Sequence, residues 1–253
     1  MGIRKVCYEL YWKLERLIVP GLRNSQYVYK EKLEALVTRG TRWLELGCGH
    51  QILPDWMRGS RQIEAALVNK AELVVGLDPT FESVRYHPTI NARVVANIED
   101  CPFDDASFSV VTANMVMEHV QDPRRALAEV NRILKPGGIF LFHTTNSRNY
   151  QFALSALLPQ SVKNKVIGLL EGRREEDVFP TAYKVNTPRE ISEISKHCGF
   201  SILELNMVNS TAAAIVLLPL AVLELMAIRL LQCKFAEKYR SNIIVLLQKA
   251  GLA

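Results

Sequence analysis

Two short runs of this sequence carry residues whose types and spacing could bind a nucleoside. The first is Glu45-Leu46-Gly47-Cys48-Gly49, which closes one apolar run, and the second is Leu77-Asp78, which closes another. Glycines have no Cβ, so the backbone of such a turn can approach a bulky ligand. A carboxylate at Asp78 can accept hydrogen bonds from the two hydroxyls of a ribose. Together the two runs predict a nucleoside site.

A nicotinamide dinucleotide also uses a carboxylate for its ribose, and it is the first alternative to weigh. Its fingerprint is Gly-x-Gly-x-x-Gly, and Ile52 stands where the third glycine belongs. Glu45 has no place in that fingerprint, yet a buried carboxylate there could hold an ammonium group or fix the amides of the turn. The residues therefore favour a nucleoside that carries an amino acid.

These residues require a sheet whose strands end side by side. Between Thr41 and Asn146 continuous apolar runs alternate with helical stretches, as is typical of a parallel sheet covered on both faces. The expected strands are 43–46, 73–77, 93–95, 108–111 and 139–142. This alternation predicts a doubly wound α/β fold, in which ligands bind at the carboxyl ends of the strands.

The clearest helix signal begins at Asp122 as N-cap, with Pro123 at the first helical position. Its buried face is expected at Ala126, Leu127, Val130, Ile133 and Leu134, and its end at Lys135-Pro136-Gly137-Gly138. Further along, residues 188–197 are expected to form a helix that Gly199 ends, followed by strands at 201–208 and 242–247.

Five short motifs occur in an order that resembles one enzyme family. They are Glu45-Leu46-Gly47-Cys48-Gly49, Leu77-Asp78, Cys101-Pro102-Phe103 with Asp105-Ala106-Ser107-Phe108, Glu118-His119-Val120, and Leu134-Lys135-Pro136-Gly137-Gly138. They are similar to the successive motifs of class I S-adenosylmethionine-dependent methyltransferases, especially the ubiquinone/menaquinone-biosynthesis-like (methyltransferase type 11) branch. The resemblance covers roughly residues 41–146 and leaves the acceptor unassigned.

The resemblance implies a Rossmann-like doubly wound sheet of seven strands, mostly parallel with an antiparallel last strand, plus helical lid insertions. It implies S-adenosyl-L-methionine as the cofactor, with the glycine turn at its methionine part, Asp78 at its ribose and residues 97–99 near its adenine. The residues placed around the cofactor are Glu45, Gly47, Cys48, Gly49, His50, Asp78, Pro79, Asn97, Ile98, Glu99, Asn114 and Met115.

The sequence departs from the family pattern at three points. Gln51 replaces the third glycine of the first motif, and Asn97 stands where an aspartate is common, although its carbonyl can still accept from an adenine amino group. The interval between the glycine turn and Asp78 is longer than usual, and residues 53–59 suggest an extra turn there.

Two histidines are candidates for a general base, because the unperturbed pKa of histidine lies near neutrality. His119 could act in this way or could cap and pack a short helix, and His143 ends the fifth strand at the functional edge. Methyl transfer depends largely on placing the nucleophile in line, so a base is not required. His87 and His197 are expected at the surface, Cys48 is expected to pack, and no spacing suggests a metal site.

Composition narrows the class of protein. The chain has 253 residues, 49% hydrophobic and 23% charged, which suits one large globular domain. Its net charge of +5 is spread along the chain, which argues against nucleic acid as a partner. The five cysteines are widely spaced, and Glu9 and Glu15 interrupt the apolar residues near the start. We expect a cytoplasmic protein.

Two long segments are expected to cover the acceptor, within a methyltransferase domain at 41–253 that follows an N-terminal helical cover at 1–40. They are about 150–186 and 209–240, and the second holds an apolar run at 212–223 that is shorter than the roughly 20 residues needed to cross a bilayer. Residues 211–231 form either a lid or pocket wall for an apolar acceptor, or a peripheral face that contacts the membrane interface. In the N-terminal stretch, Tyr27 and Tyr29 either pack in the core or lie near the cofactor.

The function expected from the sequence is transfer of a methyl group from S-adenosylmethionine to an oxygen, carbon or nitrogen of a small, apolar or lipid-linked acceptor. The alternative from a different class is a non-catalytic protein that binds the cofactor as a regulatory or assembly partner. Binding without turnover would favour this alternative.

Overall fold

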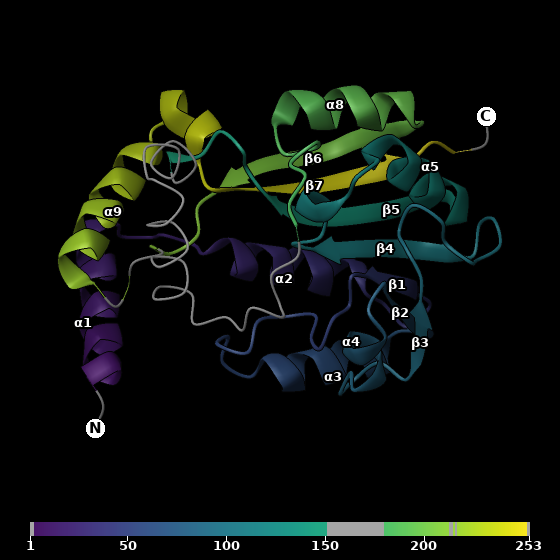
Figure 1. Cartoon of the computed structure of the whole chain (residues 1–253), viewed down its shortest axis with the longest axis horizontal. Helices are drawn as coiled ribbons and strands as arrows, with labels where there is room; N and C mark the ends of the chain where they lie inside the picture. The colour runs from purple at the N-terminus through teal and green to yellow at the C-terminus, as the bar shows by residue number, and fades with distance from the viewer. Residues whose placement is uncertain (1–2, 151–179, 213–214, 216, 252–253) are drawn as a thin grey trace. The chain divides into compact units, whose positions relative to one another are not determined.

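The computed structural model of the chain describes residues 3–150, 180–212, 215 and 217–251 (Figure 1). Two compact units share these residues. The sheet unit comprises the described residues of Gln26–Thr145, Thr181–Asn206 and Ile243–Ala253, and the helical unit comprises those of Met1–Ser25, Asn146–Pro180 and Met207–Asn242. All the residues predicted around the cofactor belong to the sheet unit.

A seven-stranded sheet forms the centre of the described fold, in the order β3-β2-β1-β4-β5-β7-β6. Its strands are β1 Arg42–Leu46, β2 Leu73–Asp78, β3 Ala92–Val95, β4 Phe108–Asn114, β5 Leu134–Thr145, β6 Phe200–Val208 and β7 Asn242–Lys249. The strands from β1 to β5 pair in parallel, and β7 lies antiparallel between β5 and β6 (Figure 1). The predicted doubly wound fold with an antiparallel last strand is confirmed.

The described helices are of two kinds, α-helices labelled α and short 3-10 helices labelled η. They are α1 Ile3–Ile18, α2 Ser25–Leu36, α3 Ser60–Lys70, α4 Phe81–Arg85, η1 Met117–His119, α5 Pro123–Ile133, α8 Pro188–His197, α9 Leu218–Leu231 and η3 Lys234–Tyr239. Each βα connection places the end of a strand before a helix, so the carboxyl ends of β1, β2, β4 and β5 share one edge of the sheet. The predicted cofactor residues lie along this edge or directly after it.

Helix α5 begins as its sequence predicts. The Asp122 side chain accepts hydrogen bonds from the backbone amides of Arg124 and Arg125, both 3.1 Å long, and Pro123 opens the helix. The end of the helix differs, because α5 stops at Ile133 and Leu134 is already extended at the start of β5. A residue before Pro136 is disfavoured in the helical region, so the chain leaves the helix early.

The interval after the glycine turn contains the extra turn that the sequence suggests. Residues 51–59 are irregular, and α3 begins only at Ser60. Glu64, buried on α3, holds this segment in place by accepting from the backbone amides of Ile52 (3.0 Å) and Leu53 (2.7 Å). Burial raises the pKa of Glu64 above its ordinary value, while the two amides lower it.

Helix α8 and the strands around it also follow the sequence. Thr187 caps α8 by accepting from the Glu190 amide, and the Glu190 carboxylate accepts in return from the Asn186 amide. This reciprocal pair resembles a capping box. Gly199 follows the helix with a φ of 77°, a left-handed conformation that favours glycine.

The helical unit is organised around α1 and α9, which pack side by side (Figure 1). Their shared core includes Tyr11, Val19, Leu225 and Ile228, all buried. The Tyr11 hydroxyl donates to Glu15 and accepts from the Ala212 amide at 2.9 Å, so it ties α1 to the segment before α9. Among the described residues, every helix falls short of the length and apolar character that crossing a membrane requires.

Candidate functional site

The glycine turn after β1 uses both of its glycines for their backbone conformation. Gly47 has a φ of 59° and Gly49 a φ of 50°, a region that L side chains rarely adopt. A Cβ on Gly47 would lie 2.4 Å from a methyl group of Val116, so this glycine lets the loop after β4 approach the turn. A Cβ on Gly49 would meet only the Gly47 carbonyl oxygen, at 3.9 Å. The open side of the turn is therefore at Gly49.

Cys48, between the two glycines, packs against β2. A Cβ on Gly76 would lie 2.8 Å from its sulfur, which shows that the thiol fills the space that this glycine leaves. Burial raises the pKa of Cys48 to about 12, and the carboxylates of Asp78 and Glu45 add to the rise. The thiolate is strongly disfavoured, in keeping with the packing role expected from the sequence.

Asp78 joins the end of β2 to the glycine turn. One carboxylate oxygen accepts from the Gly49 amide at 3.1 Å, and the other accepts from the Thr80 amide at 2.9 Å. The side chain is buried, at 7% exposure. Each carboxylate oxygen can accept a second hydrogen bond. The aspartate therefore combines a structural role with remaining capacity for two ligand hydroxyls.

Glu45 lies fully buried in β1, opposite Thr112 of β4 in the sheet register. The Thr112 hydroxyl donates to its carboxylate and accepts in turn from the Trp43 indole N–H. Burial raises the pKa of Glu45 to about 8, a rise that the Thr112 hydrogen bond opposes and nearby Glu64 reinforces. A carboxyl in such surroundings is ready to ionise beside a cation.

The sequence allowed two roles for Glu45, which are holding an ammonium group and fixing the amides of the glycine turn. The amides of the turn are held by other groups: the Cys48 amide donates to the Leu77 carbonyl at 3.1 Å, and the Gly49 amide donates to Asp78. Glu45 therefore does not hold these two amides. Pairing with an ammonium group stays a prediction.

Asn114, at the end of β4, is held from two sides. Its amide nitrogen donates to Gln26 of α2 at 2.9 Å and to the Ile52 carbonyl at 2.9 Å, and its carbonyl accepts from Gln26 at 3.1 Å. The next residue, Met115, has a φ of 59° and donates from its amide to the His143 carbonyl. A non-glycine residue in this region is strained, and such strain gathers at functional sites.

His143 is buried at the end of β5, and its Nδ1 lies 2.9 Å from the Asn114 carbonyl oxygen. Since that oxygen only accepts, Nδ1 carries the proton and Nε2 presents a lone pair. Burial lowers the pKa of His143 to about 3, so the ring is neutral at physiological pH. Nε2 has no hydrogen-bond partner within the described residues.

Tyr29 of α2 stacks on this histidine, with 5.8 Å between the ring centroids. Its buried hydroxyl has no hydrogen-bond partner in the part of the chain that the structure describes. Burial raises the pKa of Tyr29 and the charge of Glu45 raises it further, while the nearby Thr112 side chain opposes the rise. Of the two tyrosines that the sequence placed near the cofactor or in the core, Tyr29 is thus buried at the site edge, whereas Tyr27 is half-exposed and packs against Trp56.

The other histidine candidates lie differently. His119 ends η1, directly after buried Glu118, and its own ring is only partly buried. His50 is exposed beside the glycine turn. His197 is exposed as expected, but the expectation of a surface position for His87 is wrong. His87 is buried because its Nδ1 accepts from the Thr89 and Ile90 amides, which close the turn before β3.

The segment predicted near the adenine follows β3 and lies against Asp78, whose carbonyl accepts from the Ala96 amide at 3.2 Å. Ile98 is buried, and the side-chain oxygen of Asn97 accepts from the Glu99 amide at 3.0 Å. The Glu99 carboxylate accepts from the Gln121 and Asp122 amides, both at 2.9 Å. Glu99 therefore supports the turn before α5.

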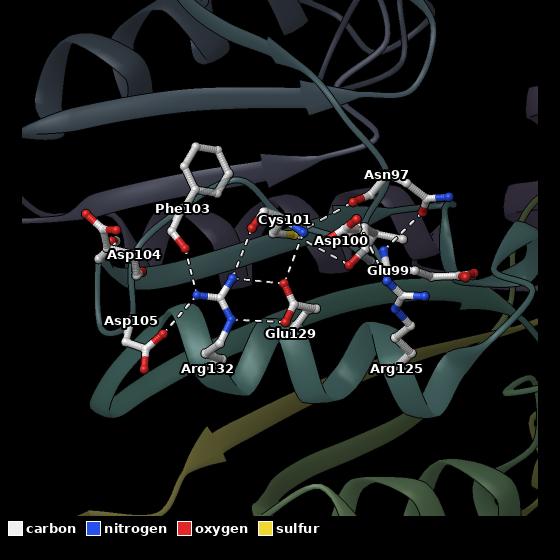
Figure 2. A network of polar contacts seen from close by, with 12 residues as sticks. Asn97, Glu99, Asp100, Cys101, Phe103, Asp104, Asp105, Arg125, Glu129 and Arg132 are labelled. Atoms are coloured by element: carbon white, nitrogen blue, oxygen red, sulfur yellow. Dashed lines mark hydrogen bonds and ion pairs between the residues drawn. The ribbon is translucent and has the colours of Figure 1, made fainter.

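Arg132 of α5 fastens the loop that follows this segment (Figure 2). Its guanidinium donates to the carbonyls of Cys101 (2.9 Å) and Phe103 (2.7 Å) and to the Asp105 carboxylate (2.8 Å). Glu129 pairs with Arg132 and accepts from the Cys101 amide at 3.0 Å. The hydrogen bonds to Glu129 and Asp105 raise the pKa of Arg132, so the cation is permanent.

Sequence reasoning missed the residues that complete this site from outside the motifs. Gln26 lies 88 positions from Asn114 and carries no local signal. Thr112 could have been found by pairing β1 with β4, which places it opposite Glu45. Glu64 could have been noticed as an acidic residue flanked by the apolar residues Ile63 and Ala65. Arg132 lies outside the apolar face of α5. In the sequence it therefore looks like an ordinary solvent-exposed residue of that helix.

Two further features carry no assignment. A shallow hollow of about 450 Å³ lies between α2 and α3. It is lined by Glu34, Gln62, Ile63, Ala66, Leu67 and Lys70, none of them a predicted site residue. Within the described ranges, the structure brings no three His, Cys, Asp or Glu side chains into a group that could hold a metal.

The arrangement matches the chemistry of an aminoacyl nucleoside. Asp78 can accept from sugar hydroxyls, and Glu45 can ionise beside an ammonium group. The Tyr29 hydroxyl is a buried donor without a partner among the described residues, and the Gly49 turn is open on one side. These four features fit S-adenosylmethionine.

Comparison with known proteins gives an independent result. Residues 22–205 match the model of a family described as the methyltransferase domain. This range includes β1 to β5 and every predicted cofactor residue.

Three curated relatives are similar to the chain. Ubiquinone biosynthesis O-methyltransferases of Vibrio atlanticus and Paracidovorax citrulli are 30% and 33% identical over 59% and 66% of this chain. Human mitochondrial 2-methoxy-6-polyprenyl-1,4-benzoquinol methylase is 32% identical over 47% of it. The matches span 60%, 66% and 35% of these relatives' own length, so each leaves a third or more of the relative unmatched.

Solved structures share the fold. S-adenosylmethionine-dependent methyltransferases of Mesorhizobium loti and Methanosarcina mazei superpose with TM-scores of 0.53 and 0.55. Each alignment covers 87% of this chain, and they cover 96% and 98% of the respective structures. Sequence identities of 18% and 17% show that the fold alone is shared.

Proposed function

Because this chain belongs to the methyltransferase domain family, we propose that it transfers a methyl group from S-adenosylmethionine to a small acceptor that is apolar or linked to a lipid. S-adenosylmethionine is the cofactor that the family and its relatives imply. When bound, it supplies an electrophilic methyl group. The observation that carries the proposal is Asp78, a buried carboxylate joined to the open glycine turn at the end of β2.

The residues of the carboxyl edge divide the binding of the cofactor between them. The Asp78 carboxylate accepts hydrogen bonds from the ribose hydroxyls. Glu45 ionises and forms an ion pair with the ammonium group of the methionine part. Gly49, on the open side of the turn, leaves backbone space for that part. Asn97 and Ile98, after β3, lie on the adenine side. The roles of Asp78 and Glu45 rest on the accepting capacity of one carboxylate and the raised pKa of the other.

Asn114 and Met115 face the methyl group in this proposal. Gln26 and Ile52 hold Asn114 rigidly, which supports the in-line placement that methyl transfer needs. His143 is the better candidate of the two histidines for taking a proton from the acceptor, since its Nε2 presents a lone pair. Its lowered pKa makes it a weak base, so its contribution to kcat is expected to be small.

The names of the relatives support the acceptor class. The human relative is named for a polyprenyl benzoquinol, and two bacterial relatives are named for ubiquinone biosynthesis. The segments 150–186 and 209–240 are the predicted cover for such an acceptor, and most of the first lies outside the described residues.

Two measurements test the proposal. Isothermal titration of the full chain with S-adenosylmethionine should show binding, and a product assay over a panel of hydroxylated aromatic and prenylated acceptors should show S-adenosylhomocysteine. Binding without turnover on any acceptor would favour the non-catalytic alternative. Absence of binding would contradict both.

A further inference from the structure

Helix α9 of the helical unit is apolar on two opposite sides. On one side Leu225 and Ile228 are buried in the core that α9 shares with α1. Leu223, Met226 and Leu230 are 63%, 55% and 69% exposed. At about 100° per residue these three lie on the side opposite the buried pair. A surface helix ordinarily presents polar residues to water, so the second apolar side requires a partner.

Further exposed apolar side chains lie at the start of the helix and in η3, which follows it. Leu220, one turn earlier, is 43% exposed, and Phe235 and Tyr239 of η3 present two exposed aromatic rings. Phe235 is 84% exposed. We call Leu220, Leu223, Met226, Leu230 and Phe235 the α9 surface.

Positive charge predominates around the α9 surface. Between residues 217 and 240 the exposed charged side chains are those of Arg229, Lys234 and Lys238. Of the two carboxylates of this stretch, Glu224 is partly buried, and the Glu237 side chain is 45% exposed but pairs with Arg240 at 3.0 Å. The exposed side chains of this stretch are therefore mainly apolar or positively charged.

This combination decides between partners. A second copy of the chain, docked through the same surface about a twofold axis, would bring like cations together. A bilayer with anionic lipids instead accepts apolar side chains below its headgroups and attracts lysine and arginine to its surface. The aromatic rings of Phe235 and Tyr239 and the nearby cation of Lys238, 5.1 Å from the Tyr239 ring centre, suit this boundary.

We propose that the α9 surface docks on a bilayer that contains anionic lipids, with α9 lying in the interface. Leu223, Met226 and Leu230 enter the acyl boundary, and Arg229, Lys234 and Lys238 meet the headgroups. The proposal does not rest on methyl transfer, because no cofactor residue belongs to the helical unit.

Co-flotation of the full chain with vesicles tests it. Vesicles of phosphatidylcholine with phosphatidylglycerol should carry the protein, and phosphatidylcholine alone should carry less. The double variant Leu223→Ser, Leu230→Ser should reduce the bound fraction at least about tenfold, because two large apolar groups are lost. Lys234→Glu with Lys238→Glu should remove the preference for the anionic vesicles.

Leu203→Ser is the matched control, since Leu203 is a half-exposed leucine on β6 of the sheet unit. It should bind vesicles as the wild type does. Titration with S-adenosylmethionine should give the same affinity for every variant, which separates this surface from the cofactor site. The proposal is overturned if the wild type does not float, or if the leucine variant floats equally. A dimer in sedimentation velocity that the leucine variant dissociates, without vesicle binding, would assign the surface to a second copy instead.

Discussion

Single residues at the carboxyl edge of the sheet combine structural and ligand-binding capacity. Asp78 holds the glycine turn with two hydrogen bonds and can still accept two more. Glu45 is buried and shares its carboxylate with Thr112. His143 and Tyr29 leave polar atoms without partners among the described residues. Buried polar atoms of this kind are costly, and at this edge they leave hydrogen-bonding capacity that a ligand can use.

Glu45 makes the stability of the protein depend on pH. Its pKa is raised from 4.5 to about 8, so its contribution to folding is complete below pH 4.5 and is lost as pH rises to about 8. Denaturant titrations should show that the wild type loses stability relative to Glu45→Gln across this window, by up to about 1.4 kcal/mol per pH unit. A difference that stays constant with pH would contradict the neutral, buried state of Glu45.

The same residue should link cofactor binding to protons. If Glu45 ionises beside the ammonium group, affinity for S-adenosylmethionine should increase as pH rises toward about 8, because the carboxyl must lose its proton. Titrations in buffers of different ionisation enthalpy should detect the released proton. Glu45→Gln should bind weakly with no proton release; an unchanged release in this variant would rule out the role.

Tyr29→Phe separates a ligand-binding hydroxyl from a merely buried one. Since the hydroxyl has no partner among the described residues, its removal should leave the free energy of unfolding unchanged or raise it by about 1 kcal/mol. Affinity for S-adenosylmethionine should fall about 3- to 10-fold if the hydroxyl contacts the cofactor. Tyr8→Phe, on an exposed ring of α1, is the control and should alter neither quantity. If Tyr29→Phe binds S-adenosylmethionine with unchanged affinity, Tyr29 only packs in the core and its hydroxyl does not contact the cofactor.

Among the elements, the strands could be predicted and the contacts between distant segments could not. Continuous apolar runs identified β1, β2, β4 and β5, whose residues are largely buried, whereas the edge strand β3 is mostly exposed. The apolar pattern of α5 gave no reason to end the helix before Leu134, a point that the following proline decides. The pairing of Gln26 with Asn114 joins α2 to β4 through side chains 88 positions apart, and no local pattern reports such a contact.

The loop after β3 owes its shape to α5, and this can be tested. Arg132→Met keeps an apolar stem but removes the guanidinium that donates to the carbonyls of Cys101 and Phe103, and the Cys101 carbonyl then keeps, among the described residues, only the Phe103 amide as donor. Because Arg132 is a third exposed, we expect a loss of about 1–3 kcal/mol in the free energy of unfolding. Amide hydrogen exchange should accelerate at residues 101–106.

Arg189→Met is the matched control for this network. It removes an ion pair with Glu193 whose side chains are both well exposed, so no measurable loss of stability is expected. Equal effects of the two variants, or no change of exchange in the loop, would show that Arg132 does not hold the segment.

On the scale of the whole molecule, the chain comprises a sheet unit that holds the predicted cofactor residues and a helical unit that holds α1 and α9. The sequence pattern predicted the first through its motifs. It did not show that the apolar run of α9 has both a buried and an exposed side, because a run of leucines has the same appearance in either case.

Leu225→Ala should weaken the helical unit alone. Leu225 is fully buried against α1, so we expect a loss of about 2–5 kcal/mol in that unit, measured by denaturation. Leu223→Ala, two residues away on the exposed side, should cost less than about 0.5 kcal/mol. Affinity for S-adenosylmethionine should be unchanged in both variants. A loss of affinity in Leu225→Ala, with the chain still folded, would show that the site depends on the helical unit.

The affinity of S-adenosylmethionine for Asp78→Ala, measured beside Asp122→Ala, tests the cofactor site most directly. Both aspartates accept from two backbone amides, so both variants should lose about 1 kcal/mol of stability. Asp78→Ala should bind the cofactor at least about tenfold more weakly, because the hydrogen bonds to a charged acceptor are lost, and Asp122→Ala should bind it as the wild type does. Equal affinity in all three proteins, or no binding by the wild type, would contradict a cofactor site at the end of β2.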